Sequence, residues 1–218
     1  MAWIGTRAAA TGTSVCVVAF LVGLGLTAMI APARSSGASK PAAVWALHQR
    51  TFYVAPYGGD GNRGMSPAHP WRTVARVDRA HLHPGDRVLF AGGATFSDAT
   101  LMPGEGFSAS GTGAAPIVFG SYGNGMARLT RGVWLGTNTN YPRGPAHLTF
   151  ENLLLGPTKG FQGTGDYIKL INLHISHLLG PMSSQETGIA TEGSHWVIDG
   201  NTISYTGDSG ILLGFSAS

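Results

Sequence analysis

An internal repeat in the last third of the chain limits most strongly what this sequence can fold into. Three nine-residue segments align without gaps, and they begin at residues 147, 167 and 195, which are 20 and 28 residues apart. A second repeat, Gly188-Ile189 and Gly210-Ile211, is spaced by 22 residues. Repeats of this length predict coils that bury their apolar side only by stacking on one another, and therefore a solenoid. Large apolar residues recur at three matching places: Leu148, Ile168 and Trp196; Phe150, Leu170 and Ile198; Leu155, Ile175 and Ile203.

Alternation within each repeat predicts which side chains face the core. In Leu148-Thr149-Phe150 successive side chains point to opposite faces of a strand, so the first and third point inward. Between Phe150 and Leu155 the inward-facing positions change from even to odd residue numbers, so the chain must turn a corner there. Asn152 and Gly200 lie at that place, and both residue types tolerate left-handed backbone angles. A leucine-rich repeat is disfavoured because its fixed leucine spacing is absent, whereas independent antiparallel hairpins remain an alternative.

The composition agrees with many short strands and tight corners. The chain has 33 glycines among 218 residues, and only 11% of its residues are charged, whereas about 25% is typical of soluble domains. Helical bundles, which need charged outer faces, are therefore disfavoured. The net charge is +3 and no basic run is present, so nucleic acid is not expected as a partner.

The first 33 residues have the order of a secretory signal. Arg7 precedes an apolar run over residues 15–30, and Ala31-Pro32-Ala33 supplies small residues for cleavage. The run is short for a membrane span, which needs about 20 residues, but an uncleaved membrane anchor over residues 15–30 stays the alternative. We therefore expect a secreted or extracytoplasmic protein with a signal peptide over 1–33, a linker over 34–50 and one folded domain over 51–218.

Short elements are expected between residue 51 and the repeats. Strands are predicted at 51–54, 87–91, 116–119 and near 128–130. Val74, Val77 and His81 have the spacing of one short amphipathic helix.

Five short motifs mark the N-terminal part of this domain: Phe52-Tyr53-Val54-Ala55-Pro56, Gly64-Met65-Ser66-Pro67, Pro70-Trp71-Arg72-Thr73, Pro84-Gly85-Asp86-Arg87-Val88-Leu89-Phe90 and Pro116-Ile117-Val118-Phe119. Together they resemble the entry region of right-handed parallel β-helix proteins, a group that includes pectate-lyase-like and other polysaccharide lyases. The resemblance implies an all-β, right-handed, single-stranded parallel β-helix whose helix near Arg72–His81 caps the open end of the coil. It also implies an exported carbohydrate-active protein, and in particular a fragment of a polysaccharide lyase that acts on an acidic polysaccharide by β-elimination.

By the same resemblance the substrate lies along the face formed by the strands that start at Gly188 and Gly210. A lyase needs a base, for which Lys159 is the candidate. It also needs a cation that neutralises the sugar carboxylate, and Asp208 and Glu186 are candidate ligands of a Ca²⁺ ion. No cluster of several aspartates accompanies them, and ordinary solvated loop residues remain the alternative for each.

Two further functions stay open. A glycoside hydrolase of the same fold needs two carboxylates about 5 to 9.5 Å apart, and Glu192 and Asp208 are expected on adjacent coils. Glu192 is thus a second catalytic candidate, and Gln162, Glu192 and Asp208 are candidate substrate-binding residues. A non-catalytic glycan-binding or surface-scaffold β-helix is the other alternative, and exposed aromatic residues without clustered charges on that face would favour it. His174 and His177 are three residues apart, so we expect them on opposite faces of a strand rather than as a metal pair.

The chain ends in an apolar strand at residues 211–215, with no capping segment after it. Because an uncovered solenoid end is unfavourable, we expect a truncated chain from which most catalytic coils are missing.

Overall fold

The structure is a computed structural model that describes residues 49–104, 108–137, 143–178 and 186–214. The predicted signal peptide and almost all of the predicted linker lie outside these residues. None of the helical structure in the described ranges is long and apolar enough to cross a membrane.

The strands of the described residues form three sheets, and every pairing between strands is parallel. Sheet A contains β1 (Thr51–Val54), β2 (Arg87–Ala91), β4 (Ile117–Tyr122), β7 (Leu148–Glu151), β10 (Lys169–Ile171) and β13 (Val197–Asp199). Sheet B contains β3 (Thr95–Phe96), β5 (Ala127–Leu129), β8 (Leu153–Leu155), β11 (His174–Leu178) and β14 (Thr202–Thr206). Sheet C contains β6 (Val133–Leu135), β9 (Phe161–Asp166), β12 (Ile189–Ser194) and β15 (Ile211–Leu213).

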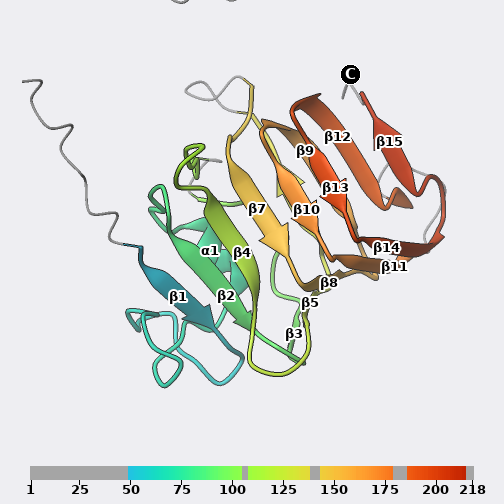
Figure 1. Cartoon of the computed structure of the whole chain (residues 1–218). Helices are drawn as coiled ribbons and strands as arrows, with labels where there is room; N and C mark the ends of the chain where they lie inside the picture. Colours follow the sequence, from blue (N-terminus) through green and yellow to red (C-terminus); the bar gives the residue numbers. More distant parts are fainter. Residues whose placement is uncertain (1–48, 105–107, 138–142, 179–185, 215–218) are drawn as a thin grey trace, which may run out of the picture. The chain divides into compact units, whose positions relative to one another are not determined.

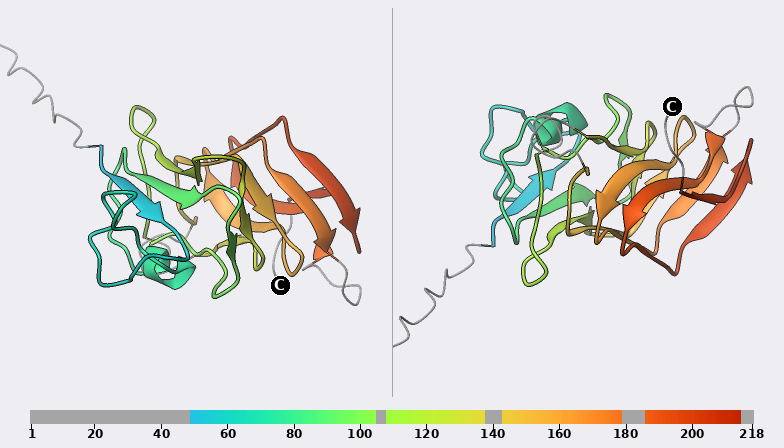
Figure 2. Two further views of the ribbon diagram at one scale, coloured as in Figure 1. Left: turned by 90° about the horizontal axis from the view of Figure 1, so that it is seen from below. Right: turned by 90° about the horizontal axis from the view of Figure 1, so that it is seen from above.

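From β4 on, the chain visits sheets A, B and C in turn, and within each sheet the spatial order of the strands follows the sequence. Figure 1 shows sheet A as a row of strands from β1 to β13, and the two views of Figure 2 show the coils following one another in sequence order. This is the arrangement that a parallel β-helix requires. The all-β class is confirmed, and antiparallel hairpins are excluded for the described strands. Right-handed winding stays a prediction, which the usual handedness of parallel crossovers favours.

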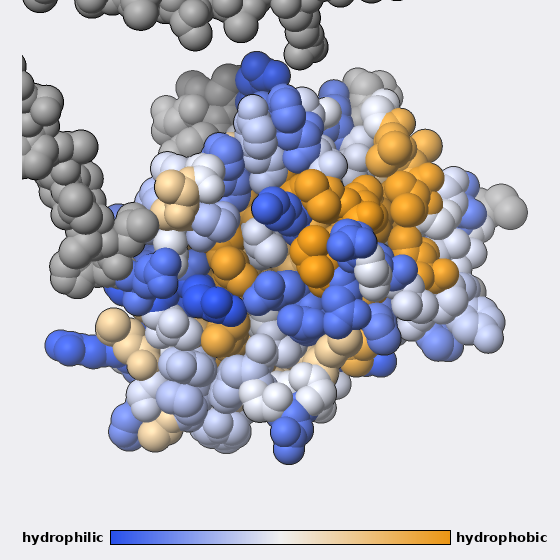
Figure 3. Space-filling view, viewed as in Figure 1, coloured by the Kyte–Doolittle hydropathy of each residue, from blue (hydrophilic) through white to orange (hydrophobic). Residues whose placement is uncertain are grey.

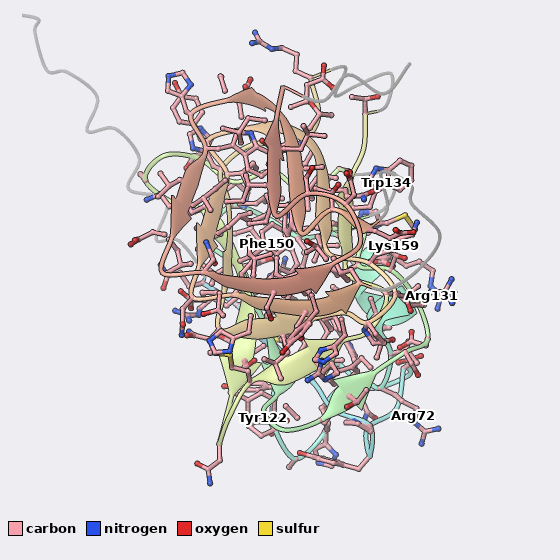
Figure 4. All side chains as sticks on the ribbon, turned by 90° about the vertical axis from the view of Figure 1, so that its right-hand side faces the viewer. Arg72, Tyr122, Arg131, Trp134, Phe150 and Lys159 are labelled. Carbon is pink, nitrogen blue, oxygen red and sulfur yellow. The ribbon has the colours of Figure 1, made fainter. Side chains whose placement is uncertain are left out.

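The register of the strands confirms the repeat alignment. Leu170 of β10 pairs with Phe150 of β7 on one side and with Ile198 of β13 on the other. Phe150 is fully buried, lies inside the coil in Figure 4, and stacks on Phe119 with ring centroids 5.0 Å apart. The same aromatic ring meets Phe161 edge-on at 4.8 Å, so one side chain joins sheets A and C through the core.

The corner between sheets A and B is built from left-handed residues, as predicted. Asn152 has a φ of 55° and Gly200 a φ of 64°. Asn172, the equivalent residue on the coil between them, has a φ of 50°, and its Nδ2 donates to Oδ1 of Asn152 at 2.8 Å. An asparagine at this corner therefore both adopts the left-handed angle and bonds to the coil below.

The corner between sheets B and C carries a glycine on four successive coils: Gly132, Gly160, Gly188 and Gly210 precede β6, β9, β12 and β15. A Cβ atom at Gly132 would lie 2.1 Å from the carbonyl oxygen of Gly160, and one at Gly160 would lie 2.2 Å from that of Gly188. Only glycine allows the coils to approach this closely, so the Gly188 and Gly210 repeat seen in the sequence is part of a longer series.

The predicted helix is present but shorter than expected. Helix α1 covers Val74–Asp78, and the Thr73 side chain caps it by accepting from the backbone N–H of Arg76 at 3.0 Å. Val74 and Val77 are fully buried, whereas His81 lies beyond the helix and is exposed. The helix ends because Arg79 leaves the helical backbone angles, with φ −90° and ψ 3°. That the helix caps the coil stays a prediction.

Candidate functional site

A groove on the outer face of sheet C brings together an exposed aromatic ring and several polar side chains. Its volume is about 210 Å³, and its polar lining comes from three successive coils. The ring is that of Trp134 on β6, which is 47% exposed. The lining consists of Trp134, Leu135, Gly136, Thr137, Gln162, Gly163, Thr164 and Glu192.

The parallel register fixes how these side chains sit beside one another. Trp134 of β6 pairs with Gln162 of β9, so the two occupy equivalent positions on adjacent coils. Thr164 of β9 pairs with Glu192 of β12, two residues further along the strands. Neighbouring strands lie about 4.8 Å apart, so hydrogen-bonding groups follow the Trp134 ring along the coil axis.

A glycine keeps the floor of this groove open. Gly163 has a φ of 141°, and a Cβ atom there would lie 2.2 Å from the carbonyl oxygen of Leu135. No other residue fits that position without moving the backbone. The strand therefore presents side chains at Gln162 and Thr164 with a gap between them.

The structure places only two of the five predicted site residues in the groove. Gln162 and Glu192 line it, as predicted for substrate-binding residues of this face. Lys159, Glu186 and Asp208 instead lie at the corner between sheets B and C, one or two residues before the corner glycines.

The two candidate calcium ligands differ in their surroundings. Asp208 is exposed, and its Oδ2 accepts a hydrogen bond from Oγ1 of Thr187 at 3.0 Å. Glu186 is 4% exposed, and its carboxylate lies against Gly207, where a Cβ atom would come within 2.4 Å of Oε2. Among the described residues no group of three or more His, Cys, Asp or Glu side chains is arranged to hold a metal ion. The calcium site stays a prediction.

Glu192 and Asp208 lie on adjacent coils, as expected, but not at equivalent positions. Ile189 pairs with Ile211, and Glu192 follows Ile189 by three residues while Asp208 precedes Ile211 by three. Glu192 therefore lies within β12, whereas Asp208 lies in the turn before β15. That the two carboxylates form a hydrolase pair stays a prediction.

Two cationic side chains occupy equivalent corner positions on successive coils. Arg131 precedes Gly132 and Lys159 precedes Gly160, and the backbone of Lys159 lies directly against Gly132. Figure 4 shows Arg131, Lys159 and Trp134 along the same side of the molecule. No ion pair joins either cation to a carboxylate within the part of the chain that the structure describes.

The prediction that His174 and His177 lie on opposite faces of a strand is wrong. Both side chains are exposed, because His177 has a φ of 63° and the left-handed residue interrupts the alternation of β11. The His177 ring stacks on Tyr205 of the next coil with centroids 5.0 Å apart. The two histidines still belong to no metal-binding group in the described ranges.

Sequence reasoning missed Trp134, the main aromatic surface of the groove. The signal was present, because Gly132-Val133-Trp134 matches Gly160-Phe161-Gln162 in spacing. Extending the glycine repeat backwards from Gly188 would have placed Trp134 in line with Gln162.

Known proteins resemble this chain over part of its length. No family model matches the chain. Over 95 residues the chain is 33% identical to a lacto-N-biosidase of Bifidobacterium longum subsp. longum, and the match covers 42% of this chain and 6% of that protein. The chain therefore aligns with only a small part of this curated relative.

Solved structures with a similar fold include a rhamnogalacturonan lyase, with a TM-score of 0.50 and 17% identity over 75% of this chain and 53% of that one. They also include the native GH136 lacto-N-biosidase of Eubacterium ramulus, with a TM-score of 0.48 and 22% identity over 69% of this chain and 30% of that one. The likeness to the rhamnogalacturonan lyase supports the fold that the three parallel sheets display.

Proposed function

We propose that this chain is a carbohydrate-binding β-helix from an exported carbohydrate-active protein, and that the saccharide lies in the sheet C groove. The observation that carries the proposal is the exposed Trp134 ring followed by Gln162, Thr164 and Glu192 in one groove. A sugar ring has an apolar face that packs on an aromatic ring and hydroxyl groups that hydrogen-bond to amides and carboxylates. The groove offers both kinds of contact side by side.

The size and lining of the groove favour binding over catalysis. At about 210 Å³ it is smaller than the roughly 300–1,000 Å³ of pockets for drug-sized ligands, so it suits a short stretch of a sugar chain. Glu192 is the one carboxylate among its described lining residues, whereas hydrolysis in most families needs two. The 95-residue similarity to a lacto-N-biosidase supports a carbohydrate ligand and leaves hydrolase and lyase relatives equally open.

Isothermal titration of the full chain tests the proposal. The ligands are rhamnogalacturonan fragments and an oligosaccharide ending in lacto-N-biose, which follow the names of the similar proteins. Trp134→Ala is expected to weaken binding by 30-fold or more, because a buried aromatic contact at the centre of an interface is worth about 2 kcal/mol or more. Glu192→Gln is expected to weaken it several-fold, because a charge-assisted hydrogen bond becomes a neutral one.

Tyr205→Ala is the control, since Tyr205 is an exposed aromatic residue on sheet B, away from the groove. Binding by the control should equal that of the unmodified chain. If Trp134→Ala and Tyr205→Ala bind all ligands alike, the saccharide does not occupy the sheet C groove.

A second candidate, β-elimination from an acidic polysaccharide, rests on Arg131 and Lys159, which precede equivalent glycines on successive coils. Arg131 can neutralise a uronate carboxylate while Lys159, in its uncharged amine form, accepts the proton from the carbon next to that carboxylate. A carbon–carbon double bond then forms as the glycosidic carbon–oxygen bond breaks, and the leaving oxygen takes a proton from water. The test follows the ultraviolet absorbance of unsaturated uronate with polyuronates, with and without Ca²⁺, in parallel with a reducing-end assay for hydrolysis. Absorbance that Lys159→Met abolishes would support a lyase, and reducing ends without absorbance would support a hydrolase.

Export through residues 1–33 is part of the proposal. Mass analysis of the protein recovered from the medium of an expressing bacterium should give a chain that begins after Ala33. A chain that keeps Arg7 and stays with the membrane fraction would support the anchor alternative instead.

A further inference from the structure

A second groove lies on the neighbouring face, where sheet C turns into sheet A. Its volume is about 460 Å³, within the range of small-ligand sites. It is lined by side chains from the corner and from the outer face of β7, β10 and β13, and these include His147, Thr149, Tyr167, Lys169, His195 and Val197. In the orientation of Figure 3, apolar side chains gather over the last coils of sheet A with hydrophilic groups beside them.

One wall of this groove is a stack of three rings. Tyr167 lies between His147, at 4.6 Å between centroids, and His195, at 4.2 Å, and both pairs are nearly parallel with 12° between planes. All three residues have left-handed backbone angles, with φ of 54°, 57° and 58°. Each such residue costs of order 1 kcal/mol or more, so the corner holds the rings in line at the expense of backbone strain. The two histidine rings cover both faces of Tyr167. A ligand in the groove would therefore meet the edges of the three rings, which carry their polar atoms.

Lys169 is the one formally charged side chain among the described lining residues of the groove. Lys169 is exposed on β10, and the structure gives it no ion pair among the described residues. No carboxylate is among the described lining residues.

Three acidic groups lie near the groove but outside its described lining, and two of them have partners of their own, whereas Asp199 is exposed on β13 two residues beyond Val197. Asp166, just before the corner, accepts hydrogen bonds from the Ser194 backbone N–H at 2.9 Å and from the Ser194 hydroxyl at 2.6 Å. These bonds from Ser194, together with Arg143 at 3.4 Å, lower the pKa of Asp166 and keep it ionised. On sheet A, Glu151 pairs with Arg87 at 3.1 Å.

We propose that this corner groove is a second saccharide site, distinct from the sheet C groove, and that it takes an anionic sugar, either a uronate or a sulfated sugar. Lys169 binds the anionic group, and the edges of His147, Tyr167 and His195 provide hydrogen-bonding atoms along the ring. Val197 and the other apolar lining residues pack against the C–H face of the sugar. A cation beside apolar surface, with no lining carboxylate, complements an anion carried on a partly apolar ring.

The test is isothermal titration of the full chain with three short ligands: an oligogalacturonide, a sulfated galactose oligosaccharide and an uncharged galactose oligosaccharide. Lys169→Met keeps the apolar stem and removes the charge, and it is expected to weaken binding of the anionic ligand by 10-fold or more. Arg63→Met removes the same charge from an exposed loop and should leave binding unchanged. Affinity should also fall with added salt, because the contact is ionic.

The outcomes separate this site from the sheet C groove. Binding of either anionic ligand that Lys169→Met weakens and Trp134→Ala does not would support the corner site, and the preferred ligand identifies the anionic group. Equal binding of charged and uncharged ligands would overturn the inference. So would anionic binding that Trp134→Ala abolishes and Lys169→Met leaves intact, although that result would still support the sheet C groove.

Discussion

Replacing Gly160 with alanine tests the packing of the coils on which both grooves depend. Gly160 stands at the corner between sheets B and C, and its φ lies outside the left-handed region. Alanine therefore meets no backbone strain there, and any effect comes from the added methyl group. That methyl would lie 2.2 Å from the carbonyl oxygen of Gly188, on the next coil. The same oxygen accepts the backbone hydrogen bond from Phe161 at 2.8 Å.

The expected cost follows from these contacts. To reach an ordinary carbon–oxygen distance, the two coils must separate locally by about 1 Å. Overpacking of this kind costs about 1–3 kcal/mol, and a weakened buried backbone hydrogen bond adds about 1 kcal/mol or more. Alanine offsets about 0.4–1 kcal/mol of this loss, because it lowers the conformational entropy of the unfolded chain. The net loss is about 1–4 kcal/mol, which corresponds to a fall in Tm of roughly 2–15 °C for a domain of this size.

Gly210→Ala is a control within the same series of glycines. A methyl group at Gly210 would meet only Cγ2 of Ile203, at 4.0 Å, an ordinary contact. Thermal unfolding followed by circular dichroism should show Gly160→Ala clearly destabilised and Gly210→Ala unchanged or slightly stabilised. Equal Tm values for Gly160→Ala and the unmodified chain would refute the close approach of the coils at this corner.

Three other substitutions test separate parts of the fold. Burial raises the pKa of Asp78 to about 7, with a further contribution from the nearby Asp98, against about 3.9 in the unfolded chain. The folded state binds the Asp78 proton more tightly than the unfolded chain does. The stabilisation that results is therefore fully present below pH 4 and is lost as the pH rises through 7. In urea titrations Asp78→Asn should be more stable than the unmodified chain by about 4 kcal/mol at pH 8, since each pKa unit corresponds to about 1.4 kcal/mol, and equal to it at pH 4. Equal stability at both pH values would contradict the shift. Asn201→Leu should lower the unfolding free energy by about 2–3 kcal/mol, because the Asn201 side chain bonds the Leu173 N–H at 2.7 Å and the Leu170 carbonyl at 2.9 Å. Phe150→Ala should cost about 3–5 kcal/mol by opening a cavity in the core, and a loss below 1 kcal/mol in either of these last two would be inconsistent with the packing described.

The interior of the solenoid could be predicted from the sequence because its period is visible there. Apolar residues at matching places fixed the three aligned segments, and the structure pairs Ile175 with Leu155 and Ile203 as that alignment requires. The corner asparagine and glycine were predictable because few residue types adopt left-handed angles without strain. Asn201 occupies the place of an inward leucine, and its bonds to two backbone groups explain why a polar residue is tolerated.

The outer surface was less predictable, because alternation stops at the corners. His177 has a positive φ, and Leu178 after it is buried, although regular alternation from the buried Ile175 would place Leu178 on the outer face. The resemblance to β-helix proteins led us to name Gln162 and Glu192 as candidates on one face, and both lie within strands of sheet C. The sequence did not reveal that Lys159 and Asp208 stay at the corner, because the length of each turn between sheets is not encoded in the apolar pattern.

In a solenoid, side chains at equivalent positions of successive coils form a row along the coil axis, even where the number of residues per coil varies. His147, Tyr167 and His195 begin the three aligned segments, 20 and 28 residues apart, yet their rings lie within 4.6 Å of one another in succession. The two coils differ by eight residues in length, yet each begins at a corner residue with positive φ, which resets the geometry of the corner. A surface built in this way can bind a repeating polymer, since equivalent positions recur at a constant distance. Functional residues of such a chain are therefore best sought by comparing corner positions on successive coils.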